Sequence, residues 1–296
     1  MNQSAAKRAL LMLEYMAGRT EGATLSEVSD ALDLPKSIAH RLLQLLVEVG
    51  YVDQHESSGR YLLTLKLTML GLRHYVHTGL DGLAQPILDR LAAETGELAR
   101  LAVVEGEKLV WVAKAQGARS GLRYDPGQDH DTGREVVLHA TATGKAWLAT
   151  LPEPEALRLV GATPMNPPPC HGPHTAQSLD EFQQMLAIAR EVGHGEAVEE
   201  GEAGTAAVAV AVINTSGVGD HCAVGTLSLA GPLIRFGPQR RMDLVKVLHQ
   251  AAKELGSIWP LHQQHQLTSH TRPQHQVGST HFSAKVAHES RLTAAL

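Results

Sequence analysis

The stretch TLSEVSDALDLPKSIAHRLLQLLVEV, residues 24–49, contains the signals for two short helices joined by a tight turn. Thr24 and Glu27 have the spacing of a capping box, which predicts that the first helix begins directly after Thr24. Pro35 is predicted as the first residue of the second helix, because its fixed backbone angle suits a first turn. Apolar side chains then recur at helical spacing, and we expect this set to be buried: Ile38, Leu42, Leu45, Leu46 and Val49.

The flanking residues extend this pair of helices into a larger unit. Ser4 has the residue type of a helix N-cap, and a helical apolar pattern follows it up to Gly18. After the second helix the apolar pattern changes from a helical period to alternation, and residues 51–54 and 60–63 are predicted to form two strands joined by a turn. Helix, helix-turn-helix and hairpin is the order of a winged helix-turn-helix, which we assign to residues 1–64.

In a helix-turn-helix the second helix lies in the DNA major groove, with its N-terminal residues nearest the base edges. The residues at that end which can donate hydrogen bonds to bases are Lys36, Ser37, His40 and Arg41. In the hairpin, we expect these residues to approach phosphates or the minor groove: Ser57, Ser58 and Arg60. The alternative is a helical hairpin that binds another protein, or nothing, with its charged side chains merely solvated.

The charge of the whole chain argues against a nucleic-acid-binding protein until it is divided along the sequence. The 296 residues include 26 Lys and Arg against 31 Asp and Glu, a formal net charge of −5, whereas such proteins usually carry a basic surplus. Residues 4–77 contain eight basic and eight acidic residues, and residues 78–260 carry a net charge of −7. The acidic surplus therefore lies outside the winged unit. We expect modest non-specific DNA affinity, with specificity resting on a few residues such as Lys36 and Arg41.

The remaining chain is predicted to form a second, mixed domain. The apolar pattern of residues 65–76 predicts a helix, and we assign residues 65–78 to a linker between the domains. Residues 79–260 combine helical patterns with apolar strands joined by short turns, which predicts a mainly antiparallel sheet and an α+β fold. A strand is also predicted at 121–124. Residues 261–296, rich in Gln, His, Ser and Thr, are predicted to be disordered.

The composition argues against several classes of protein. Two cysteines cannot build a disulfide framework, and no run of about 18 apolar residues exists to span a membrane. The first residues lack the basic, apolar and small-residue order of a signal peptide. We therefore expect a cytoplasmic protein with no membrane partner.

Three short motifs have residue types that could carry chemistry. Gly144-Lys145 lacks the earlier glycine and the following Ser or Thr of a phosphate-binding loop. Residues 170–174, with one Cys and two His, have a spacing unlike that of a structural zinc site. Glu199-Glu200 has the residue types of a general acid and base, but no nucleophile or cofactor fingerprint accompanies it. We expect no metal, no cofactor and no enzymatic activity; an enzyme using the Glu199-Glu200 region is the weaker alternative.

Several ordered stretches resemble the IclR (isocitrate lyase regulator) family of bacterial transcription factors. In the winged unit they are residues 8–10, 24–32, 34–43 and 48–52, and in the second domain they are residues 138–146, 199–204 and 227–232. The resemblance implies a C-terminal effector domain with a GAF-like sheet. It also implies homodimers joined through the DNA-binding part, often paired into homotetramers, and palindromic operators in double-stranded DNA.

The resemblance further implies a pocket for a small-molecule effector, often a carboxylate or an aromatic acid. Its lining would be Leu138, Ala140, Ala142, Thr143, Ala207, Ser228 and Ala230. Ala197, Ala207 and Ala230 stand where glyoxylate- and pyruvate-sensing relatives carry polar side chains, so we expect a wider, more apolar pocket for a larger acid. Arg123 or Arg134 would pair with its carboxylate, the alternative for each being an ordinary surface salt bridge.

The sequence therefore predicts a DNA-binding transcriptional regulator that is controlled by an organic or aromatic acid and governs a catabolic operon. The linker would carry the effect of the ligand to the spacing of two recognition helices. The other alternative that stays open is a ligand-binding signalling module that acts through protein contacts.

Overall fold

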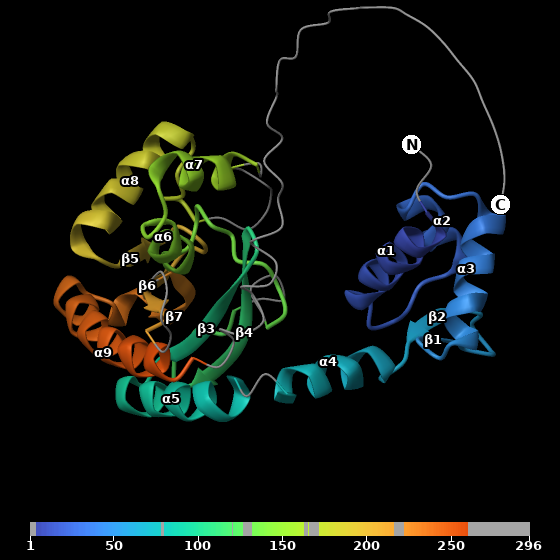
Figure 1. Cartoon of the computed structure of the whole chain (residues 1–296), viewed down its shortest axis with the longest axis horizontal. Helices are drawn as coiled ribbons and strands as arrows, with labels where there is room; N and C mark the ends of the chain where they lie inside the picture. Colours follow the sequence, from blue (N-terminus) through green and yellow to red (C-terminus); the bar gives the residue numbers. More distant parts are fainter. Residues whose placement is uncertain are drawn as a thin grey trace, which may run out of the picture. The chain divides into compact units, whose positions relative to one another are not determined.

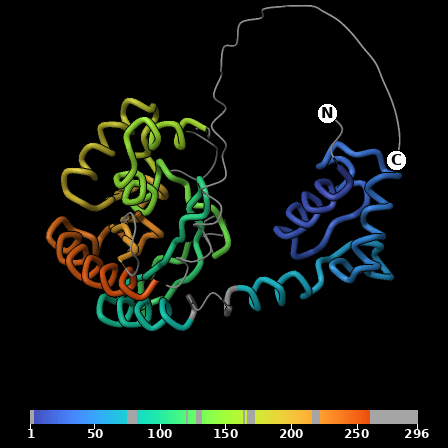
Figure 2. Tube along the Cα trace, in the orientation of Figure 1, coloured from blue at the N-terminus to red at the C-terminus, as the bar shows by residue number. Residues whose placement is uncertain are grey.

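The computed structural model describes residues 4–77, 80–119, 121–126, 132–162, 165, 172–215 and 222–259. The tail predicted to be disordered, residues 261–296, lies outside the described residues, as do Cys170 and His171 of the candidate metal motif. The Cα trace in Figure 2 follows the chain from the winged unit through two helices into the second domain.

The N-terminal unit has the predicted order of a winged helix-turn-helix (Figure 1). Its elements are α1 (Ala5–Ala17), α2 (Leu25–Ala31), α3 (Lys36–Glu48), β1 (Val52–Gln54) and β2 (Tyr61–Leu63). The Ser4 side chain caps α1, and Thr24 and Glu27 form the predicted capping box at the start of α2. Pro35 is the N-cap of α3 rather than its first residue, a difference of one position from the prediction.

One apolar core holds these helices and the wing together. It includes Met12, Leu13, Met16, Val28, Ala39, Leu42, Leu43, Leu46, Val52 and Tyr61. β1 and β2 pair antiparallel with Val52 opposite Leu63, and the buried Tyr61 anchors the wing on this core. Leu45 and Val49, predicted to be buried, are exposed instead, because the core covers a narrower side of α3 than the full apolar pattern.

Two helices follow the wing, at bounds close to the predicted ones. α4 spans Lys66–His77 and α5 spans Leu80–Thr95. α5 belongs to the second domain, because Ile87, Leu88 and Leu91 are buried in the core of that domain.

The second domain is built around a five-stranded sheet in which all neighbouring strands are antiparallel, as predicted. The strands are β3 (Leu98–Glu105), β4 (Lys108–Gln116), β5 (Gly195–Val198), β6 (Thr205–Ile213) and β7 (Ala223–Pro232), in the spatial order β4-β3-β7-β6-β5. The prediction of a strand at 121–124 is wrong. This segment has no strand, and its one large aliphatic side chain, Leu122, is exposed instead of packing on the sheet.

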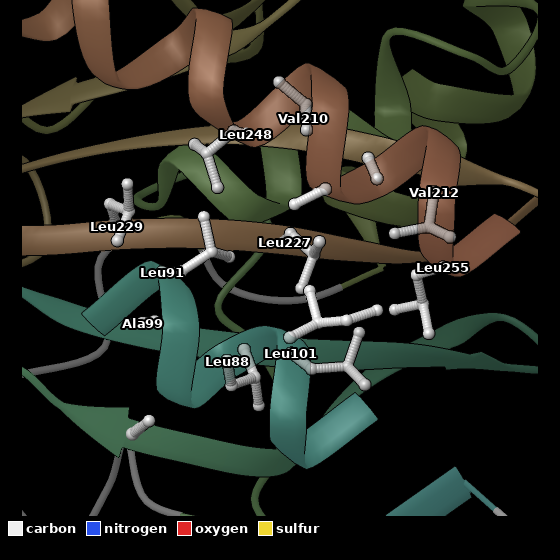
Figure 3. Packing of buried hydrophobic residues seen from close by; sticks show 14 of the residues in the cluster. Leu88, Leu91, Ala99, Leu101, Val210, Val212, Leu227, Leu229, Leu248 and Leu255 are labelled. Atoms are coloured by element: carbon white, nitrogen blue, oxygen red, sulfur yellow. The ribbon is translucent and has the colours of Figure 1, made fainter. Parts of the chain in front are cut away.

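Helices cover both faces of the sheet. α5 and α9 (Pro238–Ser257) lie on one face, over Leu and Val side chains of β3, β6 and β7 (Figures 1 and 3). α6 (Ala142–Leu148), α7 (Glu153–Gly161) and α8 (Leu179–Val192) lie on the other side. The sequence pattern does not predict α7, because Pro152 and Pro154 are typical of loops. Proline is nevertheless accepted in a first helical turn, and Pro154 lies there.

The face of the sheet beneath α6 carries small side chains. Along β6, Val208 and Val210 pack towards α5 and α9, whereas Ala207 and Ala209 pack with α6. This alternation follows from the two-residue period of a strand. The small side chains leave space between the sheet and the start of α6, where a cavity remains.

Candidate functional site

The cavity between the sheet and the start of α6 has a volume of about 40 Å³, which is room for a few water molecules. It is lined by Arg100, Tyr124, Ala140, Thr141, Ala142, Thr143, Ala197, Gly201, Glu202, Thr205, Ala206, Ala207 and Ala230. Gly144 fixes the wall formed by residues 140–143, because a Cβ there would lie 2.2 Å from the carbonyl oxygen of Leu138. The glycine of Gly144-Lys145 is thus required by a close backbone approach.

The structure brings together most of the residues predicted to line an effector pocket. Ala140, Ala142, Thr143, Ala207 and Ala230 all line this cavity. Two predicted residues do not. Leu138 lines a separate depression next to α7. Ser228 is buried on β7, opposite Arg100 in the strand pairing, but it is not part of the cavity wall.

Arg123 lies outside the cavity, which corrects the prediction that it pairs with a ligand carboxylate there. Its guanidinium is more than half exposed and forms an ion pair with Asp125 at 3.0 Å, within the same exposed segment. Arg134 is exposed as well. The surface salt bridge is therefore the arrangement that the structure has for Arg123.

Arg100 supplies the positive charge of the cavity. The residue is 7% exposed, and its guanidinium carbon lies 3.9 Å from the centroid of the Trp111 ring. Its neighbours on β3 are apolar, and an arginine is rarely buried to this extent. A lone arginine inside an apolar strand pattern was the signal in the sequence that points to this residue.

Tyr124 and Glu202 reach the cavity from two different loops. Tyr124 belongs to the segment 121–126, and Glu202 to the turn between β5 and β6. Burial raises the pKa of Tyr124, the charge of Arg100 opposes that shift, and Glu202 adds to it. The side-chain amide of Gln116 donates to the Tyr124 carbonyl at 2.8 Å and holds the segment in place. The cavity therefore presents a cation, a protonated phenol and a carboxylate around a small volume.

Two buried hydroxyls lie on the same face of β7 as the cavity. Within the described part of the chain, Ser228 Oγ and Thr226 Oγ1 have no hydrogen-bond partner. A buried hydroxyl without a partner costs about 1–3 kcal/mol. Neither hydroxyl belongs to a residue that lines the cavity.

The Gly-Lys and Glu-Glu motifs meet in one buried ion pair. Lys145 Nζ donates to both carboxylate oxygens of Glu200, at 2.8 and 2.7 Å, and the two side chains are 4% and 6% exposed. Burial lowers the pKa of Lys145 and raises that of Glu200, and the charge of each partner opposes the shift of the other. The pair ties α6 to the turn after β5. Glu200 is therefore committed to the fold.

The predicted recognition residues gather at the start of α3. Lys36, Ser37, His40 and Arg41 are all exposed, whereas the core of the winged unit contains Ala39, Leu42, Leu43 and Leu46 of the same helix. The spacing places the four exposed residues on one side of the first two turns. This side has two cations and two further hydrogen-bonding groups at the end of the helix that would approach base edges.

Ser58 and Arg60, two of the wing residues predicted to approach DNA, make different contacts in the structure. Ser58 is exposed in the turn between β1 and β2, and its hydroxyl lies 3.2 Å from His55 Nδ1. Arg60 donates to the Gly22 carbonyl at 2.9 Å and to the Glu27 carboxylate at 3.1 Å. Its guanidinium therefore holds the wing against the start of α2, and the expectation that it approaches DNA does not match these contacts.

Within the residues that the structure describes, no group of three or more His, Cys, Asp or Glu side chains is arranged to hold a metal ion. Among the helices that the structure describes, none combines the length and the apolar character needed to cross a membrane.

Comparison with known proteins places both halves of the chain. The family model described as bacterial transcriptional regulator IclR C-terminal matches residues 74–257, and the IclR helix-turn-helix domain matches residues 5–56. The HTH-type transcriptional regulator KdgR of Dickeya chrysanthemi is 30% identical over 238 residues, which cover 80% of this chain and 74% of KdgR. XynR of Escherichia coli (strain K12), also an HTH-type transcriptional regulator, is 31% identical over 210 residues, 70% of this chain and 79% of XynR.

Solved structures share the fold. An IclR transcriptional regulator from Silicibacter sp. TM1040 superposes with a TM-score of 0.73 at 24% identity, over 87% of this chain and 96% of that one. An IclR homologue from Microbacterium hydrocarbonoxydans, solved with 4-hydroxybenzoate, gives a TM-score of 0.69 at 24% identity, over 86% and 98%. With its winged helix-turn-helix and effector-type second domain, the chain belongs to the IclR family of bacterial transcriptional regulators and is a DNA-binding regulator.

Proposed function

We propose that an organic acid bound in the cavity between the sheet and α6 controls operator binding, with Arg100 as the partner of its carboxylate. The observation that carries this proposal is the burial of Arg100 in the wall of a cavity otherwise made largely of alanine and threonine. A guanidinium can bind a carboxylate through two parallel hydrogen bonds, so Arg100 in the wall would give an acid in this cavity a strong and directional contact.

The size of the cavity favours a short acid. Ala197, Ala207 and Ala230 led to the prediction of a wide pocket, yet the volume is about 40 Å³, and the large side chains of Arg100 and Tyr124 are part of the wall. Pockets for drug-sized ligands usually measure about 300–1,000 Å³. An aromatic acid, such as the 4-hydroxybenzoate bound by the Microbacterium homologue, would require Tyr124 to move. It is therefore the second candidate.

DNA recognition is proposed for the exposed side of α3, in a homodimer on a palindromic operator. In this proposal residues 1–64 bind DNA, 65–78 link the domains and 79–260 bind the effector. Support for dimers comes from α4, where Met69 and Leu72 are 59% and 58% exposed. Apolar side chains three residues apart lie on one side of a helix and suit a second copy of the chain. Two recognition helices would then read two half-sites.

The coupling between the sites follows from thermodynamics. A ligand shifts the dimer between two arrangements only if it binds them with different affinity. In this proposal α4 and α5 carry that difference from the effector domain to the recognition helices. The regulated genes are proposed to form a catabolic operon, because the acid would be its substrate or product.

The proposal is tested by measuring thermal unfolding of the full chain with a panel of acids. The panel contains short acids (glyoxylate, pyruvate, succinate) and aromatic acids (benzoate, 4-hydroxybenzoate). We expect at least one acid, from the short group, to raise the melting temperature, and calorimetry then gives its affinity. Replacement of Arg100 by Gln should weaken that affinity by about tenfold or more, since a hydrogen bond to a charged group contributes about 1.5–3 kcal/mol.

Arg123→Gln is the matched control, because it removes an exposed guanidinium outside the cavity. Its affinity for the acid should equal that of the wild-type chain. Equal affinity in Arg100→Gln would refute the assignment of the carboxylate partner. Stabilisation by aromatic acids alone would refute the short acid.

A further inference from the structure

A second depression opens where α5, β3, β4 and α9 meet at one end of the sheet. It has a volume of about 530 Å³ and is lined by Thr95, Gly96, Glu97, Gly117, Ala118, Arg119, Arg235 and Arg240. It shares no lining residue with the effector cavity. The charged groups among these lining residues are three guanidiniums and one carboxylate.

The one carboxylate in this depression is already neutralised. Arg235 Nε and Nη2 donate to the two oxygens of Glu97 at 2.7 and 2.6 Å, and Arg235 Nη1 donates to the carbonyl of Leu122. Glu97 is buried, and both oxygens of its carboxylate are bound by the guanidinium of Arg235. The pair of Glu97 and Arg235 is therefore close to neutral, and the surplus positive charge belongs to Arg119 and Arg240.

Arg119 and Arg240 come from different elements. Arg119 follows the end of β4 and is exposed, and Arg240 lies in the first turn of α9. Arg240 Nη2 donates to the carbonyl of Thr95 at 2.8 Å, which holds the guanidinium beside the depression. That hydrogen bond uses one of the five donors of an arginine. The two guanidiniums can thus act on one ligand from two directions.

The charge of this depression contrasts with that of its surroundings. Residues 78–260 carry a net charge of −7, so the effector domain as a whole repels anions. A concave region with surplus positive charge concentrates anions locally. In this depression three arginines line one hollow.

We propose that this depression is a second ligand site, which takes a phosphoryl group carried by a small metabolite. Two guanidinium forks that approach from different directions can contact different oxygens of a tetrahedral phosphoryl group, whereas a single fork already saturates a planar carboxylate. The open mouth leaves room for the rest of the metabolite. The site is independent of Arg100 and of the acid proposed for the effector cavity.

Calorimetry of the full chain at constant ionic strength tests this site. The probes are glycerol phosphate and inorganic phosphate, with glycerol and acetate as the uncharged and carboxylate probes. We expect saturable binding of glycerol phosphate, weaker by about tenfold in Arg119→Gln and in Arg240→Gln. Binding should be unchanged in Lys253→Gln, which removes an exposed cation of α9 that does not line the depression, and in Arg100→Gln. Saturable binding of inorganic phosphate alone would show a site for the free ion and overturn the metabolite assignment.

Other outcomes overturn the proposal in different ways. The site is excluded if the wild-type chain shows no saturable binding of glycerol phosphate. It is also excluded if Arg119→Gln binds glycerol phosphate as tightly as the wild-type chain does. Loss of binding in Arg100→Gln would place the anion in the effector cavity instead. If acetate binds as tightly as glycerol phosphate, the assignment of the site to a phosphoryl group is excluded. Arg119 is exposed, so its variant decides the matter even if Arg240→Gln, which loses the bond to Thr95, fails to fold.

Discussion

Arg100 and Lys145 are both buried cations of the effector domain, but the structure compensates them differently. Lys145 is bound by the two oxygens of Glu200, and the pair is buried on all sides. Arg100 lies over the Trp111 ring and lines a cavity. Lys145 is enclosed with its carboxylate partner, whereas Arg100 lines a cavity where a bound ligand would meet it. This difference separates a structural residue from a candidate binding residue.

Removing Lys145 is predicted to destabilise the chain strongly. In Lys145→Met, the carboxyl of Glu200 stays buried without its ionic partner, and breaking a buried ion pair in this way costs about 3–5 kcal/mol. Replacing both residues, Lys145→Met with Glu200→Met, should recover most of this loss, because no buried charge remains. Urea unfolding of the two variants and the wild-type chain measures the difference. Equal stability of the single and double variants would contradict the account.

The same variant should change the pH dependence of stability. Burial raises the pKa of Glu200 above its ordinary value of 4.5, and Lys145 opposes that shift. Without Lys145, the folded state therefore binds a proton at a pH where the unfolded state has released it. Such a group stabilises the fold at low pH, and the stability is lost as pH rises through its folded pKa. Relative to the wild-type chain, Lys145→Met should therefore lose stability as the pH rises above the ordinary pKa of the Glu200 carboxyl; a difference in stability that stays constant with pH would refute this.

At the scale of elements, α3 has one side for the core and one for solvent. Arg41 lies on the exposed side, and none of the core contacts depend on it. Arg41→Ala should therefore leave the circular dichroism and melting temperature unchanged. It should weaken specific DNA binding by about 1–3 kcal/mol, if Arg41 contacts a base edge.

The matched control for α3 is Arg73→Ala, which removes an exposed arginine of α4. Gel shift with a specific and a scrambled DNA separates the effects of the two variants. Arg73→Ala should keep the preference for the specific sequence. Survival of that preference in Arg41→Ala would count against α3 as the recognition helix.

α4 tests the proposed dimer. Met69 and Leu72 are exposed apolar residues on one side of this helix. Placing two charges there, as Met69→Glu with Leu72→Glu, should convert dimers into monomers in sedimentation velocity, because a charge buried in an interface is costly. Ile188→Glu makes the same type of change at an exposed residue of α8 and should leave the dimer intact. An unchanged dimer in the α4 variant would place the interface elsewhere.

At the scale of the whole molecule, the sequence predicted what depends on local chemistry. The capping box at Thr24, the turn before α3 and the alternation along the strands each carry a local signal, and these elements form as predicted. The alanines of the cavity wall were also found, through the resemblance. These features depend on residues close together in the chain.

What the sequence did not predict depends on residues that meet only in three dimensions. Arg100 and Tyr124 enter the cavity from separate segments, so the small volume could not be inferred from the alanines alone. Arg60 was assigned to DNA, but the fold brings Glu27 next to its guanidinium. Arg123 was chosen for its place after an expected strand, and that strand does not form. α7 was missed because its prolines were typical of a loop.

The central claim is that one acid, bound at Arg100, changes the affinity of the chain for DNA. Fluorescence anisotropy tests it with a labelled DNA that the wild-type chain has selected from a random-sequence pool, titrated at fixed salt with and without the stabilising acid. We predict that saturating acid changes the affinity of the wild-type chain by about 5- to 150-fold, the usual range of coupling between sites, and leaves that of Arg100→Gln nearly unchanged. The same DNA affinity in the wild-type chain with and without bound acid, or the failure to select any DNA, would contradict the account.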